Sequence, residues 1–193
     1  MWKQMSTAFR VVLLMTVLTG LVYPGLVTGL CQLLFPAKAD GSLISFDGHI
    51  VGSSLIGQNF SEPGYFHPRP SAAGKNGYNA TESGGSNYGP TNQELIDRVR
   101  ASIAEFRKAN PDYKGPIPAD LVTASASGLD PDISPASAEA QAARVAMARG
   151  IPLKELQQLI AQHTRGDELG FLGEPRVNVL ELNLALDQKF PQK

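Results

Sequence analysis

Residues 11–35 read VVLLMTVLTGLVYPGLVTGLCQLLF, a run of 25 residues without a charge that is rich in valine and leucine. As a helix with a rise of about 1.5 Å per residue, this run would extend roughly 37 Å, enough to cross a hydrocarbon core of about 30 Å. Pro24 and several glycines interrupt the run, but membrane helices carry both residue types more often than soluble helices do. The sequence therefore predicts a transmembrane helix over residues 11–35.

A cleaved signal peptide is the alternative interpretation of the same stretch. Lys3 and Arg10 form a basic leader, and Ala37-Lys38-Ala39 resembles a cleavage site. The apolar part of a signal peptide usually has about 7–15 residues, which is shorter than this run. We therefore favour an uncleaved anchor that contacts membrane lipid.

The distribution of charge predicts which way the anchor points. The 193 residues contain 17 bases and 18 acids, but three bases and no acid precede Asp40, so the remaining 14 bases and 18 acids give the rest of the chain a net charge of −4. Because positive residues stay inside, we expect residues 1–10 in the cytoplasm. Residues 36–193 would then form a periplasmic domain on a single-pass protein of the cell inner membrane. This balance excludes a strongly basic nucleic-acid binder.

Residues 36–193 are long enough for one domain with its own core. A β-hairpin is predicted near 42–52, where Asp47-Gly48 supplies a two-residue turn between apolar runs. Helices are predicted near 92–109, 135–149 and 152–164. The fold class is therefore α+β, with one amino-terminal transmembrane helix followed by a single mixed α+β extracytoplasmic domain.

Helix signals in this domain differ in strength. Thr91 with Glu94 fits a capping box, and Ser134 followed by proline fits the start of the second helix. Residues 177–186 stay ambiguous, because their leucines alternate as in a strand while Asn178 could cap a helix.

Residues 57–92 are predicted to form a long loop, since 20 of these 36 residues are Gly, Pro, Ser or Asn. The loop also contains five aromatic residues, which disordered linkers rarely have. Long ordered loops are often functional, so we predict that these rings contact a partner. They are Phe60, Tyr65, Phe66, Tyr78 and Tyr88. Within the membrane, Gly25 and Gly29 form a GxxxG pattern that predicts contact with another helix.

Motifs for catalysis are missing from the sequence. It contains neither a GxxxxGK[ST] loop nor a GxSxG elbow, and its three histidines are far apart. Asp130 and Asp132 lack the other ligands of a calcium loop, so no metal is expected. The glycines of residues 83–87 offer backbone N–H groups to an anion, although a tight turn is the simpler interpretation. We expect a non-catalytic protein without a cofactor of its own.

Several segments resemble the KdpC family of the bacterial Kdp potassium-transporting P-type ATPase. They are SLIGQNF at 54–60, YFHPRPSA at 65–72, SGGSN at 83–87, LVTASASGLD at 121–130, RVAMAR at 144–149 and VNVLELNLALD at 177–187. The resemblance implies a complex with a channel-like potassium-binding subunit KdpA, an ATP-hydrolysing subunit KdpB and a small subunit KdpF. Potassium and ATP would be handled by these partners.

The resemblance also implies a catalytic chaperone that raises the ATP affinity of the hydrolysing subunit, by analogy with the signature motif of ABC transporters. The nearest matches to that motif are Ser83, Gly84, Gly85 and Gln141, and none of them completes it. The charge distribution places these residues across the membrane from ATP. In the second mechanism, the domain therefore stabilises the complex or shapes potassium entry instead of contacting ATP. A membrane-anchored periplasmic enzyme or binding protein unrelated to transport is the alternative from another class.

Overall fold

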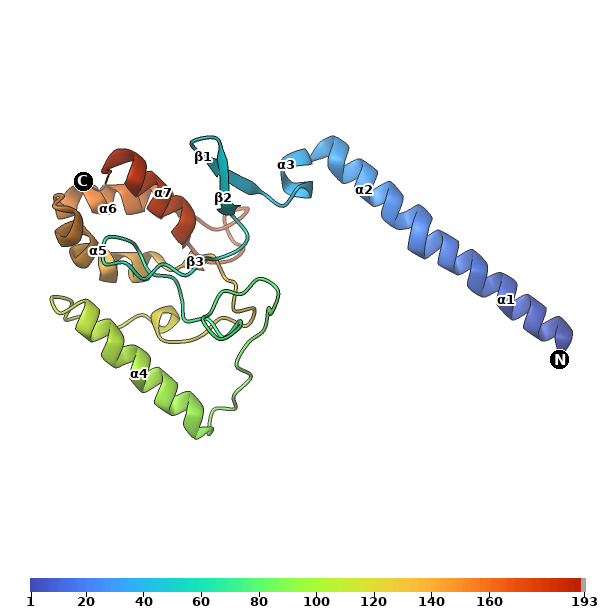
Figure 1. Ribbon diagram of the computed structural model, residues 1–193, viewed down its shortest axis with the longest axis horizontal. Helices are drawn as coiled ribbons and strands as arrows, with labels where there is room; N and C mark the ends of the chain where they lie inside the picture. Colours follow the sequence, from blue (N-terminus) through green and yellow to red (C-terminus); the bar gives the residue numbers. More distant parts are fainter. Residues whose placement is uncertain (192–193) are drawn as a thin grey trace. The chain divides into compact units, whose positions relative to one another are not determined.

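One long helix opens the chain. The computed structural model describes residues 1–191, and the chain divides into two units, Met1–Ile44 and Ser45–Lys193. In the first unit, α1 (Trp2–Val17), a π-helical turn η1 (Leu18–Val22) and α2 (Tyr23–Leu34) follow one another without a break (Figure 1). The helix is long and apolar enough to cross a membrane, and none of its residues is buried. A signal sequence also meets these criteria, so the anchor remains a prediction.

The observed helix starts at Trp2, earlier than the uncharged run at Val11, because the residues before Val11 are mostly good helix formers and charge does not end a helix. The π-helical turn ends two residues before Pro24. Proline lacks an N–H and its ring collides with the carbonyl four residues earlier, here that of Gly20 inside η1. A wider turn relieves that collision and keeps the helix continuous. A short helix, α3 (Pro36–Ala39), follows.

The predicted hairpin is confirmed. β1 (Leu43–Phe46) pairs with β2 (His49–Ser53), and the turn residues Asp47 and Gly48 have φ angles of 48° and 79°. Positive φ at both turn positions matches the right-handed twist of the strands, which is why Asp-Gly is common there. The following residues 57–92 contain no helix or strand, as predicted.

Three of the predicted helices form with small changes at their ends. α4 (Gln93–Ala109) is capped by Asn92, whose side chain accepts from the N–H of Glu94, so the predicted capping box with Thr91 is wrong. α5 (Pro135–Arg149) has the predicted bounds, with Ser134 as cap and Gly150 in the left-handed conformation. α6 (Leu153–His163) begins after Pro152. A 3-10 turn, η2 (Ala119–Leu121), lies between α4 and α5.

The ambiguous residues 177–186 divide between a strand and a helix. β5 (Arg176–Asn178) is the central strand of a small sheet, between β3 (Asp132–Ile133) and β4 (Thr164–Arg165), and both pairings are antiparallel. α7 (Val179–Lys189) then begins, with the side chain of Asn178 accepting from the N–H of Glu181. Capping by Asn178 is thus the prediction that holds.

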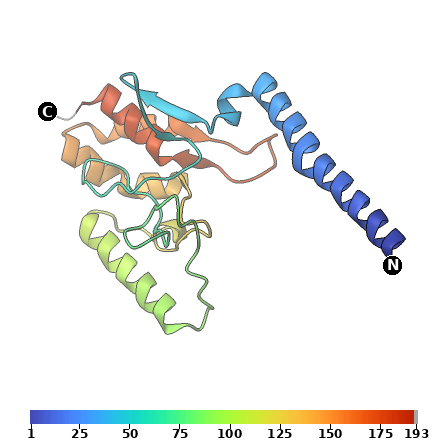
Figure 2. The same ribbon diagram turned by 45° about the vertical axis from the view of Figure 1, so that its right-hand side comes forward.

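The main core of the second unit lies where α5, α6 and α7 pack around the small sheet (Figures 1 and 2). Alanines on α5 let its neighbours approach closely, while leucines and isoleucine from α6 and α7 fill the space between the helices. The large apolar residues at 0% exposure are Phe66, Val145, Leu156, Val177, Leu182 and Leu186. α4 belongs to a smaller satellite cluster through Phe106. Phe66 ties the long loop to the main core.

Candidate functional site: the cleft beside the aromatic loop

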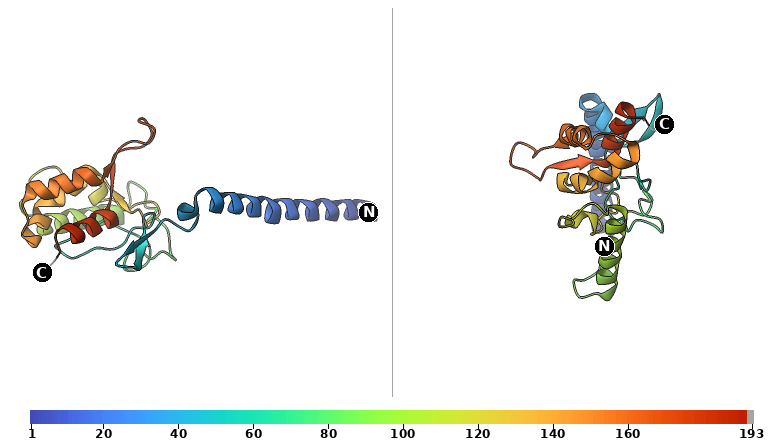
Figure 3. Two further views of the ribbon diagram at one scale, coloured as in Figure 1. Left: turned by 90° about the horizontal axis from the view of Figure 1, so that it is seen from above. Right: turned by 90° about the vertical axis from the view of Figure 1, so that its left-hand side faces the viewer.

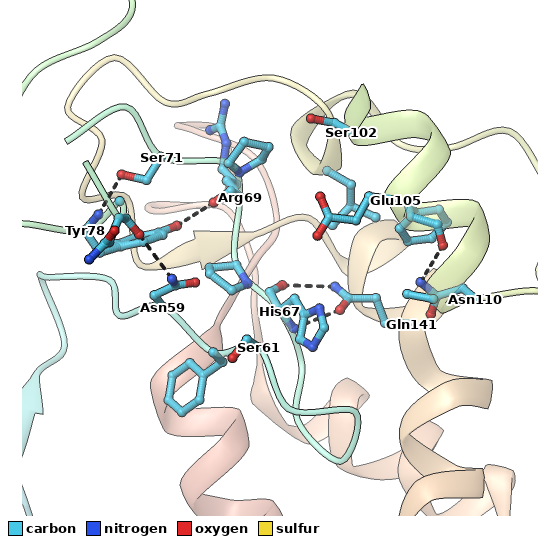
Figure 4. A pocket seen from close by; sticks show the side chains of 18 of the residues that line it. Asn59, Ser61, His67, Arg69, Ser71, Tyr78, Ser102, Glu105, Asn110 and Gln141 are labelled. Carbon is cyan, nitrogen blue, oxygen red and sulfur yellow. Dashed lines mark hydrogen bonds between the residues drawn. The ribbon is translucent and has the colours of Figure 1, made fainter. Parts of the chain in front are cut away.

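A cleft of about 450 Å³ lies between the long loop and α4 (Figure 4). Loop residues such as Asn59, Arg69 and Tyr78 form one wall, and Glu105 and Ser102 of α4 face them from the other. Gln141, from α5, lies at its floor beside His67. Two predicted contact residues, Phe60 and Tyr78, and one predicted binding residue, Gln141, therefore share this cleft.

Gln141 holds the loop rather than offering its amide to a ligand. It is 1% exposed, and its Oε1 accepts from the N–H of His67 at 2.8 Å while its Nε2 donates to the carbonyl of the same residue at 3.1 Å. Its Nε2 also contacts the carbonyl of Ser137, and its Oε1 accepts from Arg144. A carboxamide has two donors and two acceptor lone pairs, so little capacity remains.

Asn183 of α7 binds the backbone of Phe66, the residue before His67, in the same way. Its Oδ1 accepts from the N–H of Phe66 at 2.9 Å, and its Nδ2 donates to the Phe66 carbonyl at 3.0 Å. The two carboxamides together satisfy the backbone N–H and C=O groups of Phe66 and His67, which lie outside any helix or strand. They supply the hydrogen-bond partners that a buried backbone segment outside secondary structure needs.

Two arginines of α5 fix the part of the loop just before this segment. Arg144 donates to the carbonyls of Pro63 and Tyr65 and to Oδ1 of Asn110. Burial lowers the pKa of Arg144 to about 10, which still leaves it protonated at neutral pH. Among the described residues it forms no ion pair with a carboxylate, so its charge is balanced by carbonyl dipoles.

Arg149 completes this arrangement at the end of α5. It donates to the carbonyl of Gly64, forms an ion pair with Asp187 at 2.8 Å and lies over the ring of Tyr65 at 4.6 Å. Tyr65 donates its hydroxyl hydrogen to Asp187. Burial, and then the bond to Asp187, raise the pKa of Tyr65, so its hydroxyl stays protonated.

The titratable groups on the cleft wall also form hydrogen bonds or ion pairs within the chain. Burial lowers the pKa of His67, followed by the charge of Arg144, so the ring is neutral at pH 7. Its Nε2 lies 3.1 Å from the carbonyl of Glu62, which a neutral ring can use as an acceptor. Burial, together with the charge of Asp130, raises the pKa of Tyr78, whose hydroxyl donates to the carbonyl of Arg69. Arg69 in turn pairs with Asp130 at 2.7 Å.

The glycine-rich stretch lies away from Gln141's amide and packs against the chain near Ser127. The N–H of Gly84 and the hydroxyl of Ser83 both donate to the carbonyl of Ser127. A Cβ on Gly85 would lie 2.9 Å from the Ala126 carbonyl oxygen, so a side chain there is excluded. Close approach of two loops thus explains the glycines, and the N–H of Gly84 already has an acceptor.

The five loop aromatics differ in exposure. Phe66 is fully buried in the core, Phe60, Tyr65 and Tyr78 are half-buried, and Tyr88 is 38% exposed. In this conformation Phe66 therefore presents no surface to a partner. Gly25 and Gly29 lie on the open surface of the long helix, with nothing within 4 Å of an added Cβ. Their contact with another helix remains a prediction.

Sequence reasoning missed the residues that hold the loop. Arg144 and Arg149 belong to the segment RVAMAR, for which the sequence predicted no role. Asn183 lies between leucines in the segment 177–187 and was likewise given no role. An asparagine on the apolar face of a helix is a usable signal, because a buried amide needs partners. No group of three or more His, Cys, Asp or Glu side chains that could hold a metal occurs in residues 1–191.

Residues 5–188 match the family model described as "KdpC: K+-transporting ATPase, c chain". The chain belongs to the KdpC family. A potassium-transporting ATPase KdpC subunit from Koribacter versatilis is 56% identical over 192 residues, covering 99% of this chain and 97% of the relative. The KdpC subunit from Polaromonas naphthalenivorans is 60% identical over 177 residues, 92% of this chain and 90% of the relative. That of Methylococcus capsulatus is 53% identical over 187 residues, 97% and 98% of the two chains.

Proposed function

We propose that this chain is a non-catalytic accessory subunit of an ATP-driven potassium uptake complex. The observation that carries the proposal is the family match over residues 5–188, which covers the apolar helix and nearly all of the second unit. The chain has no cofactor of its own, and potassium and ATP are handled by partner subunits. Its helix anchors it in the inner membrane with the amino terminus in the cytoplasm, as the bases Lys3 and Arg10 favour.

Within the complex, the second unit acts from outside the membrane by stabilising the transporter or shaping potassium access. Two features support this action over direct contact with nucleotide. The amide of Gln141 is already hydrogen-bonded to the backbone of His67 and to Arg144. The N–H of Gly84 is already hydrogen-bonded to the carbonyl of Ser127. The chaperone effect on ATP affinity, implied by the family resemblance, would then reach the hydrolysing subunit through the membrane subunits.

The first experiment tests assembly. The full chain is produced together with the larger membrane subunits of the transporter and purified in mild detergent through a tag on this chain. We expect the large subunits and potassium-stimulated ATP hydrolysis to accompany it. A chain that emerges alone, in the same preparation that yields an active transporter, contradicts the proposal and favours an unrelated envelope protein.

The second experiment tests the side of the membrane. Cys31 is replaced by alanine, and a single cysteine is introduced at Glu82, an exposed position beside the glycine-rich stretch, or at Ser6 as the matched control near the amino terminus. A membrane-impermeant thiol reagent added to intact cells should label the first variant. The second should react only after the membrane is permeabilised. The reverse pattern would expose the second unit to cytoplasmic ATP and restore direct nucleotide contact.

A further inference from the structure

The segment between β4 and β5 exposes three large apolar side chains within four residues. Leu169 is 82% exposed, Phe171 74% and Leu172 50%. We name these three residues the apolar tip. Isolated apolar side chains are normal on protein surfaces, whereas contiguous ones mark surfaces of interaction.

The apolar tip is held in a defined shape. Glu168 and Leu172 exchange two backbone hydrogen bonds, at 2.8 and 2.9 Å, which close a tight turn around residues 169–171. Leu169 has a φ angle of +55°, a conformation that is unfavourable for leucine, and Gly170 follows at +78°. The segment projects from the rest of the second unit in both views of Figure 3. Three apolar residues at a strained, projecting turn contribute nothing to the core and point to another role.

Strand pairing and ion pairs hold the base of this projection. β4 and β5 pair antiparallel, and Arg176 of β5 binds Glu168 at 2.7 Å and Asp132 at 3.4 Å. Arg165 of β4 binds Glu181 of α7 at 2.6 Å. These contacts connect the projection to the sheet and to α7. A surface that is ordered before binding loses less conformational entropy on association.

Charge around the apolar tip indicates what it binds. Asp167 and Glu174 flank it, and neither has an ion-pair partner in the part of the chain that the structure describes. The nearby bases Arg165 and Arg176 are already paired with acids. Surfaces that bind anionic lipid carry unpaired bases and interfacial tryptophan or tyrosine, and residues 164–176 contain neither. A protein pocket with a basic rim fits this pattern better than a bilayer.

We propose that the apolar tip inserts into an apolar pocket with a basic rim on the extracytoplasmic surface of one of the larger membrane subunits. Phe171 is the central anchor, and Asp167 and Glu174 supply charge complementarity at the edge. This docking surface rests on the proposed function, since it needs the assembled transporter. It lies on a different segment from the aromatic loop and from the cleft.

The test compares three full-length variants for binding to the tagged larger subunits in mild detergent. Leu169→Ser combined with Phe171→Ser should weaken association at least about tenfold, because two large apolar side chains lose their burial. Met147→Ser is the matched control, since Met147 is 70% exposed on α5, and should change association less than about twofold. Glu174→Lys reverses one charge of the edge and should weaken binding without disturbing the apolar residues.

Each outcome decides between interpretations. If the wild-type chain and the double variant associate equally well, this docking surface is overturned and the proposed function stays intact. If the wild-type chain does not associate, the proposed function itself is contradicted. A tip-dependent dimer of the isolated chain that competes with the subunits would assign it to a second copy. If the double variant unfolds, Glu174→Lys still supplies the answer, because tighter or unchanged binding contradicts the basic rim.

Discussion

Replacing Asn183 by leucine should destabilise the second unit by removing the clamp on Phe66. Asn183 is 1% exposed and Phe66 0%, so water cannot replace the two hydrogen bonds of 2.9 and 3.0 Å that the side chain makes to the Phe66 backbone. A buried backbone group without a partner costs about 1–3 kcal/mol, which gives about 2–6 kcal/mol for the N–H and the C=O together. Leucine fills a similar volume and recovers some apolar burial, so we expect a net loss of about 3 kcal/mol in the free energy of unfolding.

The assay is thermal unfolding of the full chain in mild detergent, followed by near-ultraviolet circular dichroism. Tyr65, stacked against Arg149, reports on the loop. At about 2–4 °C per kcal/mol for a domain of this size, the unfolding midpoint should fall by about 6–12 °C. The matched control is Gln188→Leu, which exchanges an exposed amide on the same helix and should shift the midpoint by less than about 2 °C. Equal midpoints for the two variants would refute the assignment of a stabilising role to the clamp. Amide hydrogen exchange at Phe66 should accelerate only in Asn183→Leu.

Three further variants test other parts of the structure. Burial and the charge of Arg144 keep the pKa of His67 below its ordinary value of 6.5. His67 therefore contributes stability that is present above pH 6.5 and is lost as the pH falls through its folded-state pKa. In His67→Gln, the unfolding midpoint should depend less on pH below pH 6.5. Gly128→Ala should cost about 2 kcal/mol or more in urea unfolding, because Gly128 has φ +68° and an added Cβ would meet backbone and side-chain atoms at 2.7–2.8 Å, whereas Gly150→Ala, at φ +65° with nothing within 4 Å, should cost only about 1 kcal/mol. Arg144→Lys should lower stability by about 2 kcal/mol despite keeping the charge, since a lysine cannot reproduce the guanidinium's fork of four hydrogen bonds; a calorimetric midpoint equal to wild type would contradict this.

Local signals were sufficient to predict most helix and turn positions. Asp47-Gly48 fixes its hairpin because the pair tolerates positive φ, and Ser134 with Pro135 starts α5 because both residues suit a helix beginning. The cap of α4 was misplaced by one residue, since Thr91 and Asn92 are both good caps and only the observed backbone distinguishes them. Two-residue strands such as β3 carry no detectable period.

Tertiary contacts over long sequence separations were beyond such reasoning. No sequence motif around Gln141 or Asn183 predicts its hydrogen-bond partner. The partners are backbone N–H and C=O groups, which occur in nearly every residue. The sequence identified Gln141 as a weak binding candidate through a family analogy, and its observed hydrogen bonds place it in the framework of the loop. The burial of each loop aromatic depends on neighbours far along the chain, which the local sequence does not reveal.

The long-range contacts that hold the loop also affect the order in which the domain acquires its structure. Phe66 is fixed by a residue 117 positions later, and Tyr65 by one 122 positions later. Contacts of such separation form slowly, since a large loop must close before they stabilise anything. During synthesis, residues 57–92 therefore emerge well before the helix that holds them. Their glycine- and asparagine-rich composition keeps residues 57–92 soluble until α7 has been synthesised and the contacts that hold the loop can form.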